Sequence, residues 1–134
     1  APYLSEHVEL LEQMFSGKNE KLIDLNLLVI RYLMKTLDIR TKTVLLSDLD
    51  VPSTGSQRLV DICKRTGAGQ FLAQAPAKKF IDEKLFLDAG VELRFITPPT
   101  PVYPQLWGDF LANLSVLDLL LNCGPKAREI LISP

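Results

Sequence analysis

The chain has 134 residues, of which 47% are hydrophobic and 23% charged, and 15 Lys and Arg residues stand against 16 Asp and Glu. This length and composition fit one globular domain with its own core, and the near-neutral charge provides no basic excess to attract a nucleic-acid backbone. No run of roughly 20 apolar residues is available to cross a bilayer, and no signal peptide is visible. We therefore expect a soluble, cytoplasmic protein with neither nucleic-acid binding nor a membrane span.

The first helix is expected over residues 7–15. This segment places Val8, Leu11 and Phe15 on one face at helical spacing, and Gly17 ends it. His7 therefore lies on a helix that we expect at the surface.

The second helix begins with Asn19 as N-cap and continues to about Leu37. The remainder of this helix is largely apolar, so we expect it to be buried over most of its circumference. Its polar positions form one narrow stripe, namely Asp24, Arg31 and Lys35.

After Arg40, short apolar runs alternate with amphipathic helices. Strands are expected at 43–46, 70–73 and 91–96, and helices at 53–66 and 77–89. In the helix at 53–66, Leu59, Ile62 and Cys63 point inward, and Gly67 ends it. This alternation with short connections predicts βαβ units and a parallel sheet. The expected fold is a single α/β domain over residues 1–134, three-layer-like, with a short βαβαβ sheet flanked by helices, an N-terminal helical pair and C-terminal helices.

Prolines at 98, 99, 101 and 104 exclude helix and central strand, because proline lacks the donor N–H. We expect a stiff, extended loop over 98–104. A helix follows over 107–121, either continuous or restarting at Ser115. Gly124 and Pro125 separate it from a last helix that reaches about Ile132.

Three loops are candidates for a ligand site, because ligands of open parallel sheets bind beyond the carboxyl ends of the strands. They lie at 47–56, 74–79 and 97–105, and we expect their polar residues to converge. In the first, Ser56 and Arg58 with the free N–H groups of a helix start form a cradle for a phosphate or carboxylate. The alternative is an ordinary serine N-cap beside a solvated arginine.

The other two loops carry further candidates. Lys78 and Lys79 stand at a helix start, where a cation works against the helix dipole, which hints at an anionic ligand. Solvated surface charge is the alternative. Tyr103 and Gln105 suit contacts with a sugar, or they pack the loop onto the domain.

Polar side chains also mark the leucine-rich helix near the C-terminus. Ser115 and Asp118 have the spacing of a capping box, and Asn122 shares the face of Asp118 one turn later. Burying such groups without partners costs free energy, so they either satisfy local backbone or face a polar cavity. Asp118 is the candidate catalytic group.

The sequence offers no metal or redox motif. Cys63 and Cys123 lie in apolar helical stretches, so we expect buried thiols rather than a disulfide framework. One histidine without CxxC or HxxxH spacing leaves zinc without a ligand set, and no Ser-His-Asp or Cys-His arrangement is apparent. We expect no metal, and no cofactor can be named.

Four stretches resemble the WbqC-like protein family. They are 58–64, 79–83, 103–105 and 114–124, in the same order and spacing, and the early Ala1-Pro2-Tyr3 followed by two helices agrees as well. The resemblance covers essentially the whole chain, and 114–124 is its most specific part. The candidate residues that match the family are Ser56, Arg58, Lys79, Tyr103, Gln105, Ser115, Asp118 and Asn122.

The chain also departs from the family pattern. WbqC-like chains normally carry an N-terminal portion with a His-Gln-Pro segment and an acidic strand end, and this sequence has neither. It begins with Ala1 rather than Met, so we expect the C-terminal part of a longer protein, inactive alone if the other portion supplies catalytic groups. A glycine-rich turn of the family is replaced by residues 74–77, and a His-Pro pair by Thr100-Pro101.

The family is bacterial and often encoded among genes for surface polysaccharides such as the O-antigen of lipopolysaccharide. The resemblance implies a transferase that moves an acyl or aminoacyl group to an amino sugar, or otherwise acts on a nucleotide-linked sugar. In that case Arg58 and Lys79 hold phosphates or a carboxylate, Tyr103 and Gln105 hold the sugar, and Asp118 orients or deprotonates the acceptor.

The alternative is a non-catalytic binding or scaffold subunit of the same pathway. In that case the leucine-rich C-terminal helix is a partner or dimer surface, and the polar residues are helix caps. A homo-oligomer is compatible with either hypothesis.

Overall fold

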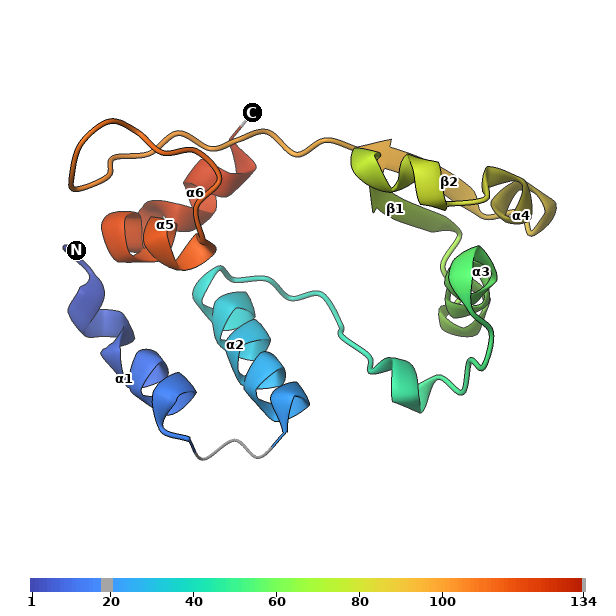
Figure 1. Ribbon diagram of the computed structural model, residues 1–134, viewed down its shortest axis with the longest axis horizontal. Coiled ribbons are helices and arrows are strands. Elements are labelled where there is room, and N and C mark those ends of the chain that lie inside the picture. Colours follow the sequence, from blue (N-terminus) through green and yellow to red (C-terminus); the bar gives the residue numbers. More distant parts are fainter. Residues whose placement is uncertain (18–20, 134) are drawn as a thin grey trace. The chain divides into compact units, whose positions relative to one another are not determined.

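The computed structural model describes residues 1–17 and 21–133. The chain forms two compact units, of which unit 1 comprises Ala1–Thr41 with Pro99–Pro134 and unit 2 comprises Lys42–Pro98. Unit 1 is helical, and unit 2 holds the sheet with its helices (Figure 1). The expected single domain stays a prediction, and the expected N-cap Asn19 lies outside the described residues.

Helix α1 (Leu4–Phe15) buries a different face from the one predicted. His7 and Leu10 are buried, whereas Val8 and Phe15 are exposed. The surface position expected for His7 is also wrong, because its Nδ1 lies 2.5 Å from the Tyr32 hydroxyl. Apolar residues occupy more than one face of this short helix, so their spacing alone does not indicate which face finds a neighbour.

Helix α2 (Leu22–Thr36) follows in unit 1, and the expectation of burial over most of its circumference is wrong. None of its residues is buried, and Leu22, Ile23 and Ile30 are 72%, 47% and 46% exposed. Apolar composition shows what a helix can bury, but a neighbouring element must be present to cover it.

The strand expected at 43–46 is not formed. Residues 42–45 run without a strand partner, and Leu46–Asp48 is a short 3-10 turn closed by the Asp48 N–H on the Leu45 carbonyl at 3.0 Å. The apolar run has the composition of a strand, but a strand also needs a neighbour to bond its backbone.

Unit 2 contains a two-stranded parallel sheet, so the α/β class with flanking helices is confirmed but the described sheet has two strands rather than three. β1 (Gln70–Gln74) pairs in register with β2 (Glu92–Ile96). Alternate strand residues such as Phe71 and Leu93 pack toward the core of this unit, as the period of two requires.

The helices of unit 2 begin and end at identifiable signals. α3 (Gly55–Thr66) ends at Gly67, as predicted, with φ +71° and its N–H bonded to the last turn. The helix expected over 77–89 is instead two pieces, the 3-10 helix Ala75–Phe80 and α4 (Glu83–Asp88). Asp82 separates them, because its carboxylate accepts the Lys84 N–H at 3.0 Å as an N-cap.

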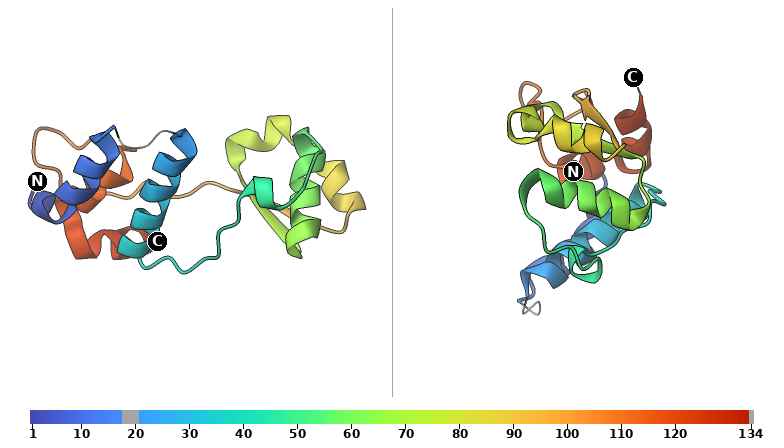
Figure 2. Two further views of the ribbon diagram at one scale, coloured as in Figure 1. Left: turned by 90° about the horizontal axis from the view of Figure 1, so that it is seen from below. Right: turned by 90° about the vertical axis from the view of Figure 1, so that its right-hand side faces the viewer.

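The core of unit 2 is a compact cluster around Phe86, Val60 and Cys63. Phe86 is 1% exposed, and its ring lies 5.5 Å from that of Phe71. Cys63 is buried as predicted, and Val60 takes the inward position that was not predicted. Figure 2 shows α3 and α4 beside the two strands.

The C-terminal half of unit 1 consists of α5 (Val116–Cys123), a 3-10 turn (Gly124–Lys126) and α6 (Ala127–Ile132). Residues 98–104 lie in neither helix nor strand, as predicted, and the following helix begins after Ser115 rather than at Trp107. The core of this unit is a cluster of buried side chains, namely Leu37, Tyr103, Leu119, Leu120, Cys123 and Ala127.

The start of the chain is fixed against the end of α5. The Tyr3 N–H donates to the Leu121 carbonyl at 3.0 Å, and the Tyr3 ring lies over the Cα of Gly124. Gly124 has φ +50°, so it combines a left-handed backbone with a position where a side chain would meet the ring. Among the described helices, none is both long enough and apolar enough to cross a membrane.

Replacing Phe86 by Ala tests the core of unit 2. We expect the free energy of unfolding of this unit to fall by about 3–5 kcal/mol, because the substitution removes buried apolar area and leaves a cavity. Denaturant unfolding followed by circular dichroism measures the loss. Leu87→Ala is the matched control, since Leu87 is 79% exposed and a surface change is worth within about 0.5 kcal/mol. Equal effects of the two substitutions would contradict this core.

Candidate functional site

The Asp118 carboxylate is the centre of a polar cluster in unit 1. Its Oδ2 accepts the Tyr103 hydroxyl at 2.9 Å and the Gln105 Nε2 at 3.4 Å. Its Oδ1 accepts the Asn122 Nδ2 at 3.1 Å. Three side chains from a loop and from the helix itself therefore orient one carboxylate, which is how a charged group is held at a partly buried position.

Gln105 also holds its own loop. Its Nε2 donates to the Leu111 carbonyl, and its Oε1 accepts the Leu111 N–H, both at 2.9 Å. This pair of bonds closes residues 105–111 into a loop. Because the same Nε2 reaches Asp118, the loop and α5 are joined through Gln105.

Tyr103 packs the proline-rich loop onto unit 1. Its ring is buried and lies edge-to-face with Phe110 at 5.7 Å between centroids. Burial raises the pKa of the Tyr103 phenol, and the hydrogen bond to the Asp118 carboxylate raises it further. The phenol therefore remains a hydrogen-bond donor at neutral pH, and of the two roles considered for Tyr103 the structure shows the packing role.

Ser115 and Asp118 have different roles, although their spacing is that of a capping box. The Ser115 hydroxyl accepts the Leu117 N–H at 3.2 Å, so Ser115 is the N-cap of α5. The Asp118 carboxylate instead receives the side chains described above. Asn122 also donates to the Asp118 carbonyl at 2.9 Å.

A small concavity of about 190 Å³ lies beside this cluster. Its polar wall consists of Asp118, Asn122 and Gln105. Trp107, which is 87% exposed, also lines it. Trp107 was not among the predicted site residues. A signal was present, because it is the only tryptophan of the chain and follows the proline-rich loop, but no motif distinguished it from a core residue.

The remaining predicted residues belong to unit 2. The Ser56 hydroxyl accepts the Asp82 N–H at 2.9 Å, which ties the start of α3 to the loop before α4. Arg58 donates through Nε to the Ser53 carbonyl. The N-cap of α3 is Thr54, whose side chain makes no capping bond, so the serine cap considered as the alternative is not formed.

Lys78 and Lys79 are exposed at the end of the 3-10 helix rather than at a helix start. The dipole penalty that hinted at an anionic ligand is therefore absent, because cations are favourable near a helix C-terminus. Lys78 lies 3.8 Å from the Glu83 carboxylate and 5.5 Å from the Phe95 ring centroid. Lys79 lies over the Phe80 ring and has no ion pair among the described residues.

The first two candidate loops border one cavity in unit 2, of about 530 Å³. Gly55 and Ser56 come from one loop, and Gln74 and Ala77 from the other. The other lining residues are apolar and come from α3, β1 and the end of the 3-10 helix, including Phe80. Arg58, Lys78 and Lys79 are not part of this lining, so the cavity itself is not the basic cradle that the sequence suggested.

Both cysteines are free and buried, as predicted. Burial raises the pKa of the Cys63 thiol and of the Cys123 thiol, which keeps them protonated at neutral pH. Neither thiol is therefore suited to act as a nucleophile.

The structure thus places five predicted residues in one local arrangement and the rest in the other unit. Convergence of all three loops stays a prediction. The five that lie together in unit 1 are Tyr103, Gln105, Ser115, Asp118 and Asn122.

Comparison with known proteins assigns the family. The model of the WbqC-like protein family matches residues 1–130. The chain belongs to the WbqC-like family. A relative in Mycobacterium tuberculosis (strain ATCC 25618 / H37Rv), described as uncharacterized protein Rv1507c, is 28% identical over 108 residues. That match covers 80% of this chain but 47% of the relative, so this WbqC-like chain spans about half the length of the curated relative it matches. No solved structure matches it.

The raised pKa of Tyr103 predicts a pH effect on this WbqC-like chain. Because folding favours the protonated phenol, its contribution to stability is complete below about pH 10, the ordinary tyrosine pKa, and is lost as the pH rises through the higher folded value. Spectrophotometric titration of phenolate should show one late-titrating tyrosine that Tyr103→Phe removes.

Asp118→Asn provides the matched comparison for this titration. It removes the charge that helps to raise the Tyr103 pKa, so the late titration should move to lower pH. A titration that is unchanged in both variants would contradict the arrangement.

Proposed function

We propose that this WbqC-like protein acts in bacterial cell-surface polysaccharide assembly, in the cytoplasm, on a nucleotide-linked or amino sugar. Membership of the family supports the pathway. The observation that carries the chemistry is the Asp118 carboxylate, fixed by three side-chain donors at the wall of a small concave site.

The reaction proposed is transfer of an acyl or aminoacyl group from an activated acyl donor to the amine or hydroxyl of an amino sugar. The new amide or ester bond forms as the bond from the acyl carbon to the donor's leaving group breaks, and the leaving group departs with that electron pair. Asp118 takes the proton from the attacking nitrogen or oxygen of the acceptor, as a positioned general base. Tyr103 and Asn122 hold the carboxylate in one orientation, so that its position does not depend on solvent.

The site suits a small acceptor group. Its volume of about 190 Å³ is below the roughly 300–1,000 Å³ of pockets that enclose drug-sized ligands. An exposed indole such as that of Trp107 covers the apolar face of a sugar ring, and Gln105 and Asn122 hydrogen-bond its polar groups. On this proposal Trp107 takes the stacking role first considered for Tyr103.

Unit 2 by itself offers cationic groups for an anionic ligand such as the phosphates of a nucleotide-linked sugar. Ser56, Arg58, Lys78 and Lys79 are proposed for this role. Lys79 is exposed without an ion pair among the described residues, and the guanidinium of Arg58 has donors beyond the one used on Ser53. The start of α3 adds N–H groups that no side chain caps.

Titration of the complete polypeptide with nucleotide sugars by calorimetry tests the binding. Arg58→Ala and Lys79→Ala should each weaken binding about tenfold, because each removes a charge-assisted contact. Lys84→Ala is the matched control, since Lys84 is an exposed lysine already paired with Asp88 at 2.7 Å. Absence of binding, or binding that neither substitution changes, would reject the phosphate role.

Asp118→Asn tests the chemistry separately. Turnover with an activated acyl donor and an amino-sugar acceptor should fall about 100- to 10,000-fold, the usual contribution of a general base. Acceptor affinity should change far less, because the amide keeps the shape of the carboxylate. Turnover unchanged by Asp118→Asn would sink the catalytic role, and binding without any turnover would favour the non-catalytic subunit.

A further inference from the structure

The uncovered face of α2 follows a regular pattern. Ile23, Leu27, Ile30 and Met34 recur at spacings of four, three and four residues, the a/d pattern by which two helices pack side by side. Ile23 and Ile30 are 47% and 46% exposed, and no residue of α2 is buried. This apolar helix therefore has a face that no described element of unit 1 covers.

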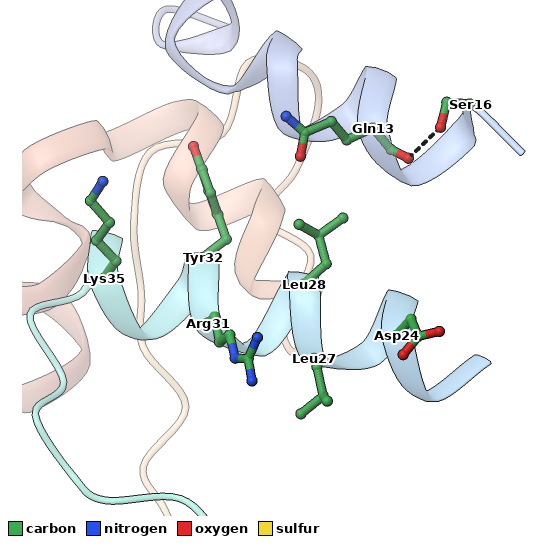
Figure 3. A pocket seen from close by; sticks show the side chains of 8 residues that line it. All are labelled: Gln13, Ser16, Asp24, Leu27, Leu28, Arg31, Tyr32 and Lys35. Atoms are coloured by element: carbon green, nitrogen blue, oxygen red, sulfur yellow. Dashed lines mark hydrogen bonds between the residues drawn. The ribbon is translucent and has the colours of Figure 1, made fainter. Parts of the chain in front are cut away.

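The neighbouring groove shows which side of α2 is open. A groove of about 590 Å³ lies between α1 and α2, and six of its eight lining residues come from α2. Leu28 and Tyr32 point toward α1, whereas Leu27 points away from it (Figure 3). Leu27 nevertheless lines this groove together with Asp24 and Arg31, so the a/d stripe borders the groove.

The charges beside this stripe identify the occupant. Asp24 and Arg31 each follow a stripe residue by one position, so they lie on the same flank, two turns apart. Neither side chain makes a hydrogen bond or ion pair with any described residue. In an antiparallel pair of identical helices, this flank meets its own copy, and Asp24 of one copy faces Arg31 of the other.

The two-fold axis produces that ion pair twice, which is the self-complementarity that an isologous interface requires. A parallel pair would instead set this flank against the opposite one, at Asn26 and Leu33, which carries no charge. The charge pattern therefore fits an antiparallel pair of copies. A parallel pair would form no ion pair at these positions.

We propose that the α2 face formed by Ile23, Leu27, Ile30 and Met34 is an isologous, antiparallel interface between two copies of this chain, flanked by two reciprocal Asp24–Arg31 ion pairs. Fifteen residues of helix span about 22 Å, which places the contact at the small end of specific interfaces. The expected dimer is therefore weak, with a dissociation constant of about micromolar order.

Charge reversal distinguishes this interface from any other use of the face. The complete polypeptide is followed by light scattering after size exclusion and by sedimentation velocity over a range of concentrations. Asp24→Arg and Arg31→Asp should each weaken the dimer at least about tenfold, because each puts like charges together twice. The double reversal restores the complementary pairs and should restore the dimer. An equimolar mixture of the two single variants should form a heterodimer.

Two further variants define the result. Ile30→Asp places a charge in the stripe and should abolish the dimer, whereas Glu129→Arg, an exposed reversal on α6, should leave it unchanged. A chain that is monomeric up to roughly millimolar concentration, a dimer that both single reversals leave intact, or a double reversal that fails to recover the dimer would each overturn the proposal. Circular dichroism of each variant confirms that the fold is retained.

Discussion

Much of unit 1 depends on one hydrogen bond, between the buried Tyr103 hydroxyl and the Asp118 carboxylate. A buried phenol needs an acceptor and a partly buried carboxylate needs donors. The hydrogen bond between them therefore offsets the free-energy cost of burying both groups. The bond joins the proline-rich loop to α5 and sets the Tyr103 ring against Leu119 and Leu120 in the core. The same contact that stabilises the packing therefore also orients the carboxylate.

Local signals made the regular parts of the fold predictable. Gly67 ends α3 because its left-handed backbone suits glycine. The strands at 70–74 and 92–96 pair in parallel, as expected for two strands that a helical crossover connects. The errors share one physical cause. The run at 43–46 and most of α2 have the composition of buried elements, yet burial and strand pairing depend on a neighbour elsewhere in space. Asp82 shows a second limit, since an N-cap inside an otherwise helical pattern splits the helix.

The candidate site was predictable in its residues but not in its contacts. Chemical type singled out Asp118, Asn122, Tyr103 and Gln105, because polar groups on a leucine-rich helix and after a stiff loop need partners. Fifteen positions separate Tyr103 from Asp118, and no helical or strand periodicity relates residues across an irregular loop. The two hydrogen bonds between Gln105 and Leu111 could not be predicted for the same reason. Helix capping explains Ser115 but not Asp118, because the Asp118 carboxylate accepts side-chain donors from Tyr103, Gln105 and Asn122 instead.

Two leucine-rich helices of the same unit lead to opposite conclusions. α5 buries Leu119, Leu120 and Cys123, and its carboxylate is satisfied within the chain, so little of it remains for a partner. α2 has no fully buried residue, although Leu33 packs against the core, and its Asp24 and Arg31 find no partner among the described residues. Apolar area favours association without choosing an orientation, whereas unpaired charges at fixed spacing do choose one. For this reason the proposed interface lies on α2 rather than on the C-terminal helix first considered, because the spacing of opposite charges on α2 makes that surface complementary to itself.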